Sequence, residues 1–173
     1  MKRAVTFVTC ALASLVTASA QSADLDTTLE RTETVLAHAL GDVAEDASPL
    51  LEMFLLPPDY VFPDDLRYSG EKGPDRPIED ANRELVRNVG LTSGLLAGCG
   101  LDWINTQFAP MMAWQRERLP ENERNGLHIA KIGVSHGFAM EAGTMLSSNS
   151  AFDCAAMASR VEGVTFGDDL SNP

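Results

Sequence analysis

The chain is poor in basic residues and has no long apolar run beyond its first twenty positions. Its 173 residues include 13 Lys and Arg against 25 Asp and Glu, a formal net charge of −12 at pH 7. Such a charge repels the phosphates of nucleic acids and of anionic lipids. No stretch after residue 20 approaches the ~20 apolar residues that a membrane-spanning helix needs. The sequence therefore predicts neither nucleic-acid binding nor a membrane span.

The common signatures of catalytic and metal sites are also missing. The sequence contains no GxSxG, HExxH, CxxCH, phosphate-loop or EF-hand pattern. His128 and His136 are eight positions apart and no cysteine is expected to be free, so we predict no metal and no cofactor. These absences make a non-enzymatic role the leading expectation, although they leave an enzyme possible.

The N-terminus has the pattern of a secretory signal peptide. Lys2 and Arg3 precede an apolar stretch at 4–16, and small residues end the pattern at Ala20, just before Gln21. Cleavage there would leave 11 basic against 25 acidic residues, a net charge of −14. We therefore predict a signal peptide over residues 1–20 and a single mature domain over 21–173, located in the periplasm or secreted.

Two cysteines would remain after that cleavage, because Cys10 lies inside the signal peptide. In an oxidising compartment, a distant pair such as Cys99 and Cys154 normally forms a structural disulfide. Closing a loop of this size stabilises the folded state by roughly 4 kcal/mol in the chain-entropy model. We predict this disulfide.

The spacing of apolar residues predicts an all-α, single-domain bundle of about five helices with an acidic, Pro-rich arm. The arm, residues 47–77, either packs on its own core or docks on another chain. The segment 162–173 is acidic and contains glycine, which predicts a loose tail. The helices are expected at 24–46, 77–99, 103–119 (kinked by Pro110) and 120–146, with a last one after residue 150.

Glycines recur every four residues on the second expected helix, at Gly90, Gly94 and Gly98. Each glycine inside a helix costs ~1 kcal/mol, so three in register indicate close approach of another backbone. The approaching group is either a neighbouring helix, or a small anionic ligand held in a glycine-floored groove with Arg83 and Arg87 at its mouth.

The fourth expected helix carries a similar face of small residues. Packing of the second helix on the fourth, or contact across a homodimer, would bury both faces. The face on the fourth helix comprises Gly126, Gly133, Gly137, Met140 and Thr144.

The best candidates for catalysis are His136 and Glu141, on the most apolar of the expected helices. A histidine in such a place is either a general base or ligand contact, or a buried core residue. Five residues place the two side chains about 140° apart around a helix, so they do not pair locally.

Three classes of function stay open at this point. The leading hypothesis is a secreted or periplasmic non-enzymatic binding or protein-interaction protein, chaperone-like or an accessory subunit, with a protein partner. The alternatives are a small periplasmic enzyme with its site near His136 and Glu141, and a structural homodimer formed through the glycine-bearing helices.

Overall fold

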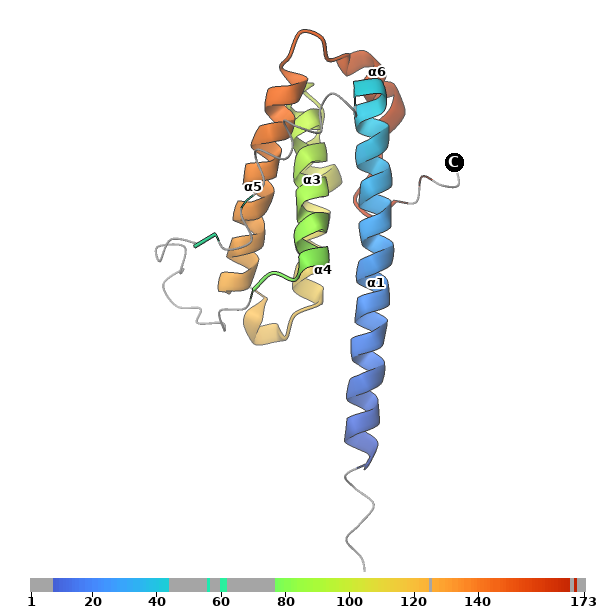
Figure 1. The fold of residues 1–173 in the computed structure, drawn as a ribbon, viewed down its shortest axis with the longest axis vertical. Helices are drawn as coiled ribbons and strands as arrows, with labels where there is room; N and C mark the ends of the chain where they lie inside the picture. Colours follow the sequence, from blue (N-terminus) through green and yellow to red (C-terminus); the bar gives the residue numbers. More distant parts are fainter. Residues whose placement is uncertain are drawn as a thin grey trace, which may run out of the picture.

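The computed structural model describes residues 8–43, 56, 60–61, 77–124, 126–168 and 170. Within them the fold is an all-α bundle without strands, as predicted (Figure 1). The elements are α1 (Val8–Leu40), a 3-10 turn η1 (Gly41–Val43), α3 (Asp80–Gly98), a π-helix η3 (Ile104–Phe108), α4 (Ala109–Glu117), a 3-10 turn η4 (Glu121–Glu123), α5 (Leu127–Ser147) and α6 (Cys154–Val161).

The third expected helix is divided where it contains proline. Pro110 lies in the first turn of α4, and the preceding turn widens into η3, where the Ala109 N–H donates to the Ile104 carbonyl. Proline has no N–H and its ring clashes with the carbonyl four residues before it, which explains the wider turn.

The fourth expected helix begins later than predicted. Pro120 precedes the short turn η4, and Gly126 has an extended backbone before α5 starts at Leu127. The helical pattern from residue 120 was therefore wrong for its first two turns.

Some predictions fall outside what the structure tests. Of the arm at 47–77, only residues 56, 60, 61 and 77 are described, so its course lies outside the described residues. Helix α1 runs through the predicted cleavage position at Ala20, and its N-terminal half extends beyond the rest of the bundle (Figure 1). The signal peptide stays a prediction.

Helix α3 lies between α1 and α5 (Figure 1). Eleven of its 19 residues, from Leu85 to Leu96, are buried. Apolar side chains of α1 and α3 share two core clusters, to which α5 also contributes side chains such as Ala139 and Ile132. The contributions of the first two helices include Leu25, Leu36, Ala39 and Leu40 of α1, and Leu85, Val89, Leu91, Leu95 and Leu96 of α3.

Long-range contacts hold part of the segment after α6 against the body as far as residue 167, and the loose tail over 162–173 as a whole stays a prediction. The Phe166 N–H donates to the Thr106 carbonyl at 2.7 Å, and the Arg31 side chain donates to the Gly167 carbonyl at 3.1 Å. The Phe166 ring also packs edge-on against Trp114, with 5.8 Å between centroids. These long-range contacts outweigh the polar local composition.

Candidate functional site

The most unusual ionisable group of the described chain is His136, on the inner side of α5. It is 2% exposed, and its Nε2 lies 3.0 Å from the Ser93 hydroxyl of α3. Two aromatic rings lie beside it. Trp103, just before η3, has its ring centroid 6.2 Å from that of His136, and Phe108, the last residue of η3, has its centroid at 4.7 Å. Three elements, α3, η3 and α5, therefore meet at one imidazole.

Burial lowers the pKa of His136 from 6.5 to about 4, because the charged form loses its hydration. The ring is therefore neutral at pH 7. It can accept a hydrogen bond from Ser93 or donate one to it, depending on its tautomer.

A serine bonded to a histidine is half of a nucleophilic pair, but this pair is closed to substrate. Ser93 is 0% exposed, and no carboxylate among the described residues orients the imidazole. The bond between Ser93 and His136 therefore serves as a polar link between two helices. Sequence reasoning missed Ser93, because 43 positions separate it from His136.

The structure does not bring Glu141 to His136. Glu141 is exposed while His136 is buried, so the two side chains lie on different faces of α5. A general acid and base would have to share one substrate, and this arrangement does not provide a shared site.

The glycine face of α3 is covered by α5. A Cβ atom at Gly90 would lie 2.6 Å from Ala139 Cβ, and one at Gly94 would lie 2.7 Å from the backbone N of Thr144. The space that the groove hypothesis assigned to a ligand is thus filled by another backbone. Of the two groups expected to approach the glycines, a neighbouring helix or a ligand, the structure shows the helix, α5.

Of the small-residue face predicted for α5, Met140 and Thr144 lie at the contact, because backbone atoms of both are close to a Cβ added at Gly94. Gly143 also lies there, although it was not part of the predicted face. Gly143 is packed against Gly94, with 3.0 Å from its added Cβ to the Gly94 Cα. By contrast, no atom of the described residues lies within 4 Å of a Cβ added at Gly137. The C-terminal half of α5 therefore makes the close contact.

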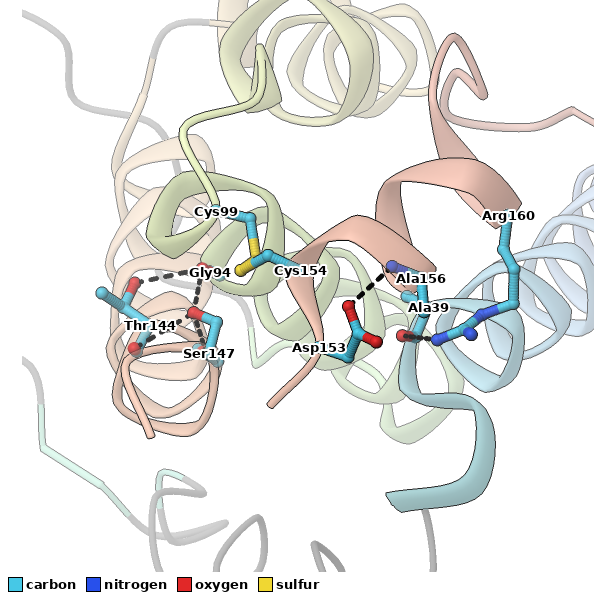
Figure 2. Close-up of a disulfide and its surroundings, with 10 residues drawn as sticks. Ala39, Gly94, Cys99, Thr144, Ser147, Asp153, Cys154, Ala156 and Arg160 are labelled. Atoms are coloured by element: carbon cyan, nitrogen blue, oxygen red, sulfur yellow. Dashed lines mark hydrogen bonds between the residues drawn. A yellow bond between two sulfur atoms is a disulfide. The ribbon is translucent and has the colours of Figure 1, made fainter. Parts of the chain in front are cut away.

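Hydroxyl groups add hydrogen bonds across the same contact. Ser147 and Thr144 both donate to the Gly94 carbonyl, at 3.3 and 3.4 Å (Figure 2). A buried carbonyl gains stability from each partner, so this contact combines close backbone packing with side-chain hydrogen bonds.

Arg83 and Arg87 are half-buried and bonded within α3. Arg83 pairs with Asp80 at 3.0 Å and donates to the Ile78 carbonyl, while Arg87 pairs with Glu84. Arg87 Nε and the neighbouring Asn88 Nδ2 are buried and have no hydrogen-bond partner among the described residues. These two atoms are the donors that an anion would use, so the prediction of an anionic ligand remains untested.

The disulfide between Cys99 and Cys154 is present, as predicted, with 5.4 Å between the Cα atoms. It joins the end of α3 to the first turn of α6, where the Asp153 side chain accepts from the Ala156 N–H (Figure 2). At the other end of α6, Arg160 donates to the carbonyls of His38 and Ala39 at the end of α1. Helix α6 thereby ties α1 to α3.

The outer face of α5 carries exposed apolar side chains. Phe138 is 43% exposed and Met145 is 52% exposed. Tyr60 packs edge-on against Phe138, with 6.0 Å between the ring centroids. Residues seven apart lie on one side of a helix, and this side points away from the glycine contact with α3.

The part of the chain that the structure describes has neither a metal-binding cluster nor a membrane-spanning helix. No group of three or more His, Cys, Asp or Glu could hold a metal ion there. No helix among the same residues is both long and apolar enough to cross a membrane.

A scan against protein-family models, a search of curated proteins and a search of solved structures found no match for this chain. Function has to be argued from the chain's own residues.

Proposed function

We propose that this chain is an exported, non-enzymatic interaction protein that binds a protein partner through the outer face of α5. The observation that carries the proposal is the exposure of Phe138 and Met145 on a helix whose other face is already filled. Exposed large apolar side chains that share one helix face are typical of docking surfaces.

The two residues that were candidates for catalysis also favour a non-enzymatic role. His136 is buried and bonded to Ser93, and Glu141 points to another face. The inner side of α5 therefore acts in folding, and its outer side is the surface left for recognition.

The charge of the chain indicates the chemistry of the partner. The net charge is −12, and Glu141 lies between Phe138 and Met145 on the outer face of α5. Opposite charges at an interface steer association and raise its rate. The partner we propose is a protein segment that presents apolar side chains flanked by Lys or Arg.

Site-specific photocrosslinking in the producing cell tests this function. A photoreactive phenylalanine analogue at position 138 or 145 should give the same crosslinked partner. The same analogue at Ser159, exposed on α6, should not give it. Met145→Glu should weaken the crosslink from position 138.

Two results would argue against the proposal. Equal crosslinks from 138 and 159 would mean that contact is nonspecific. A crosslinked species of twice the chain's mass would favour the structural homodimer, with the outer face of α5 as its interface.

A further inference from the structure

The three segments that surround His136 contain no charged side chain. Residues 88–101, 103–115 and 132–140 include no Asp, Glu, Lys or Arg. His136 is the ionisable group in the middle of this neutral zone, where Ser93, Trp103 and Phe108 contact its ring. A positive charge on the imidazole would therefore lack an adjacent counter-charge from α3, η3 or α5.

The charged residues at the borders of this zone do not reach the ring. On α3 the nearest is Arg87, itself a cation, and Asp102 before η3 is exposed. On α5, Lys131 and Glu141 are each five positions away, about 140° around the helix. None of the ion pairs between described residues includes His136.

We propose that the junction of α3, η3 and α5 around His136 is an acid-labile lock, which opens when a solvent proton binds the imidazole. Opening exposes the apolar surface of Trp103 and Phe108. The lock works whether or not a partner occupies the outer face of α5.

The geometry of the contact explains why a small change would open it. At Gly94 the two helices touch backbone to backbone, and at Gly90 the backbone of α5 and the short Ala139 side chain lie against α3, so no flexible side chain can fill a gap at either of these glycines. Close-packed contacts of this kind lose much of their attraction when surfaces separate by 1 Å. Hydrating the charged ring requires such a separation.

The aromatic rings provide a counter-effect that must be weighed. A cation over Trp103 or Phe108 gains cation–π attraction. Burial alone lowers the pKa of His136 to about 4, and attraction to the rings would bring the pKa back toward 6.5 and make the pH response smaller.

The direction of the pH effect follows from this difference. The folded-state pKa, about 4, is below the unfolded value of 6.5, so the opened or unfolded chain binds more protons between these values. The stability that depends on neutral His136 is fully present well above pH 6.5 and is lost as the pH falls toward 4. From pH 6.5 to 5.0, where most carboxylates stay ionised, the opening or unfolding constant should rise about 15-fold through His136 alone.

Urea unfolding of the wild type and of His136→Gln at pH 6.5 and 5.0 tests the lock. Glutamine can still bond to Ser93 but does not titrate in this range. Between these two pH values the folding constant of the wild type should fall about 15-fold more than that of the variant. His38→Gln, at an exposed histidine of α1, should keep the wild-type response.

An NMR titration of the histidine rings in the wild type gives a second test that needs no variant. The His136 signal should titrate at least a full unit below 6.5, the ordinary value for a histidine, or change as the near-UV circular dichroism of the tryptophans is lost. An equal pH response of His136→Gln and wild type would overturn the lock. So would titration of His136 at 6.5 or above in the folded protein.

Discussion

Helix α3 is held by its two neighbours in different ways. Toward α5 it presents Gly90 and Gly94, and the two backbones touch. Toward α1 it presents Leu85 and Leu96, which interdigitate with other aliphatic side chains. One contact depends on the absence of side chains and the other on their presence.

This difference determines which contact can adjust to a substitution. Aliphatic side chains can change rotamer and fill a gap, whereas a backbone that touches another backbone has no such freedom. The α1 side is also held by α6, through the disulfide and Arg160. We therefore expect the α5 contact to be the more sensitive to single substitutions.

The largest effect is expected for Gly94→Ala. The new Cβ would overlap the Met140 carbonyl and lie 2.8 Å from the Gly143 Cα, both backbone atoms of α5. The helices must separate, which should cost at least ~3 kcal/mol, a large part of the stability of a small domain. Urea unfolding followed by circular dichroism measures the loss.

Gly98→Ala is the matched comparison on the same helix. Its Cβ would overlap the Ser147 hydroxyl, which can rotate away, and lie 2.9 Å from the Ser147 Cβ. No backbone atom of α5 is as close as at Gly94, so the loss should be smaller. If both substitutions were equally tolerated, close backbone packing would not be what holds α3 to α5.

The second largest effect is expected on the α1 side, for Cys154→Ser. Loss of the disulfide, which spans 55 positions, should lower the free energy of unfolding by ~2–4 kcal/mol. The urea midpoint, compared with that of the oxidised wild type, reports this loss. The double variant with Cys99→Ser should be no less stable than the single one, and an additive loss would mean that each cysteine acts separately.

A smaller effect is expected for Arg160→Gln. The guanidinium Nε lies 2.7 Å from the His38 carbonyl, and a second nitrogen lies 3.3 Å from that of Ala39. A charged donor at a helix C-terminus favours the helix dipole, so its loss should cost ~1 kcal/mol. Faster amide exchange should appear at the end of α1 and not in α5. Equally faster exchange in both helices would contradict a local role of Arg160 at the end of α1.

Local signals explain which elements could be predicted. Helix α3, Asp80–Gly98, lies within the expected range 77–99, because Pro77 and the glycines around Cys99 mark its ends. The disulfide followed from cysteine number and the assumed compartment alone. A few neighbouring residues were sufficient to predict the ends of α3, and the number of cysteines was sufficient to predict the disulfide.

Contacts between distant segments explain what could not be predicted. Helix α5 is apolar nearly all round, so its sequence does not show which face meets α3, and Gly137 was placed on the wrong one. Ser93 and His136 meet only once two helices have packed. Phe166 lies in a polar segment, and its contact with Trp114 requires the folded body.

The smallest expected effect has the opposite sign and concerns Gly137→Ala. Gly137 is an exposed position of α5, and nothing in the described part of the chain lies within 4 Å of an added Cβ. Alanine removes the conformational freedom of glycine from the unfolded chain, so this substitution should stabilise the protein by ~0.5–1 kcal/mol. A rise in the urea midpoint, beside the fall for Gly94→Ala, would show that the effect of a methyl group depends on the face of the contact. A loss similar to that of Gly94→Ala would instead indicate that another backbone also covers the outer face of α5 in solution.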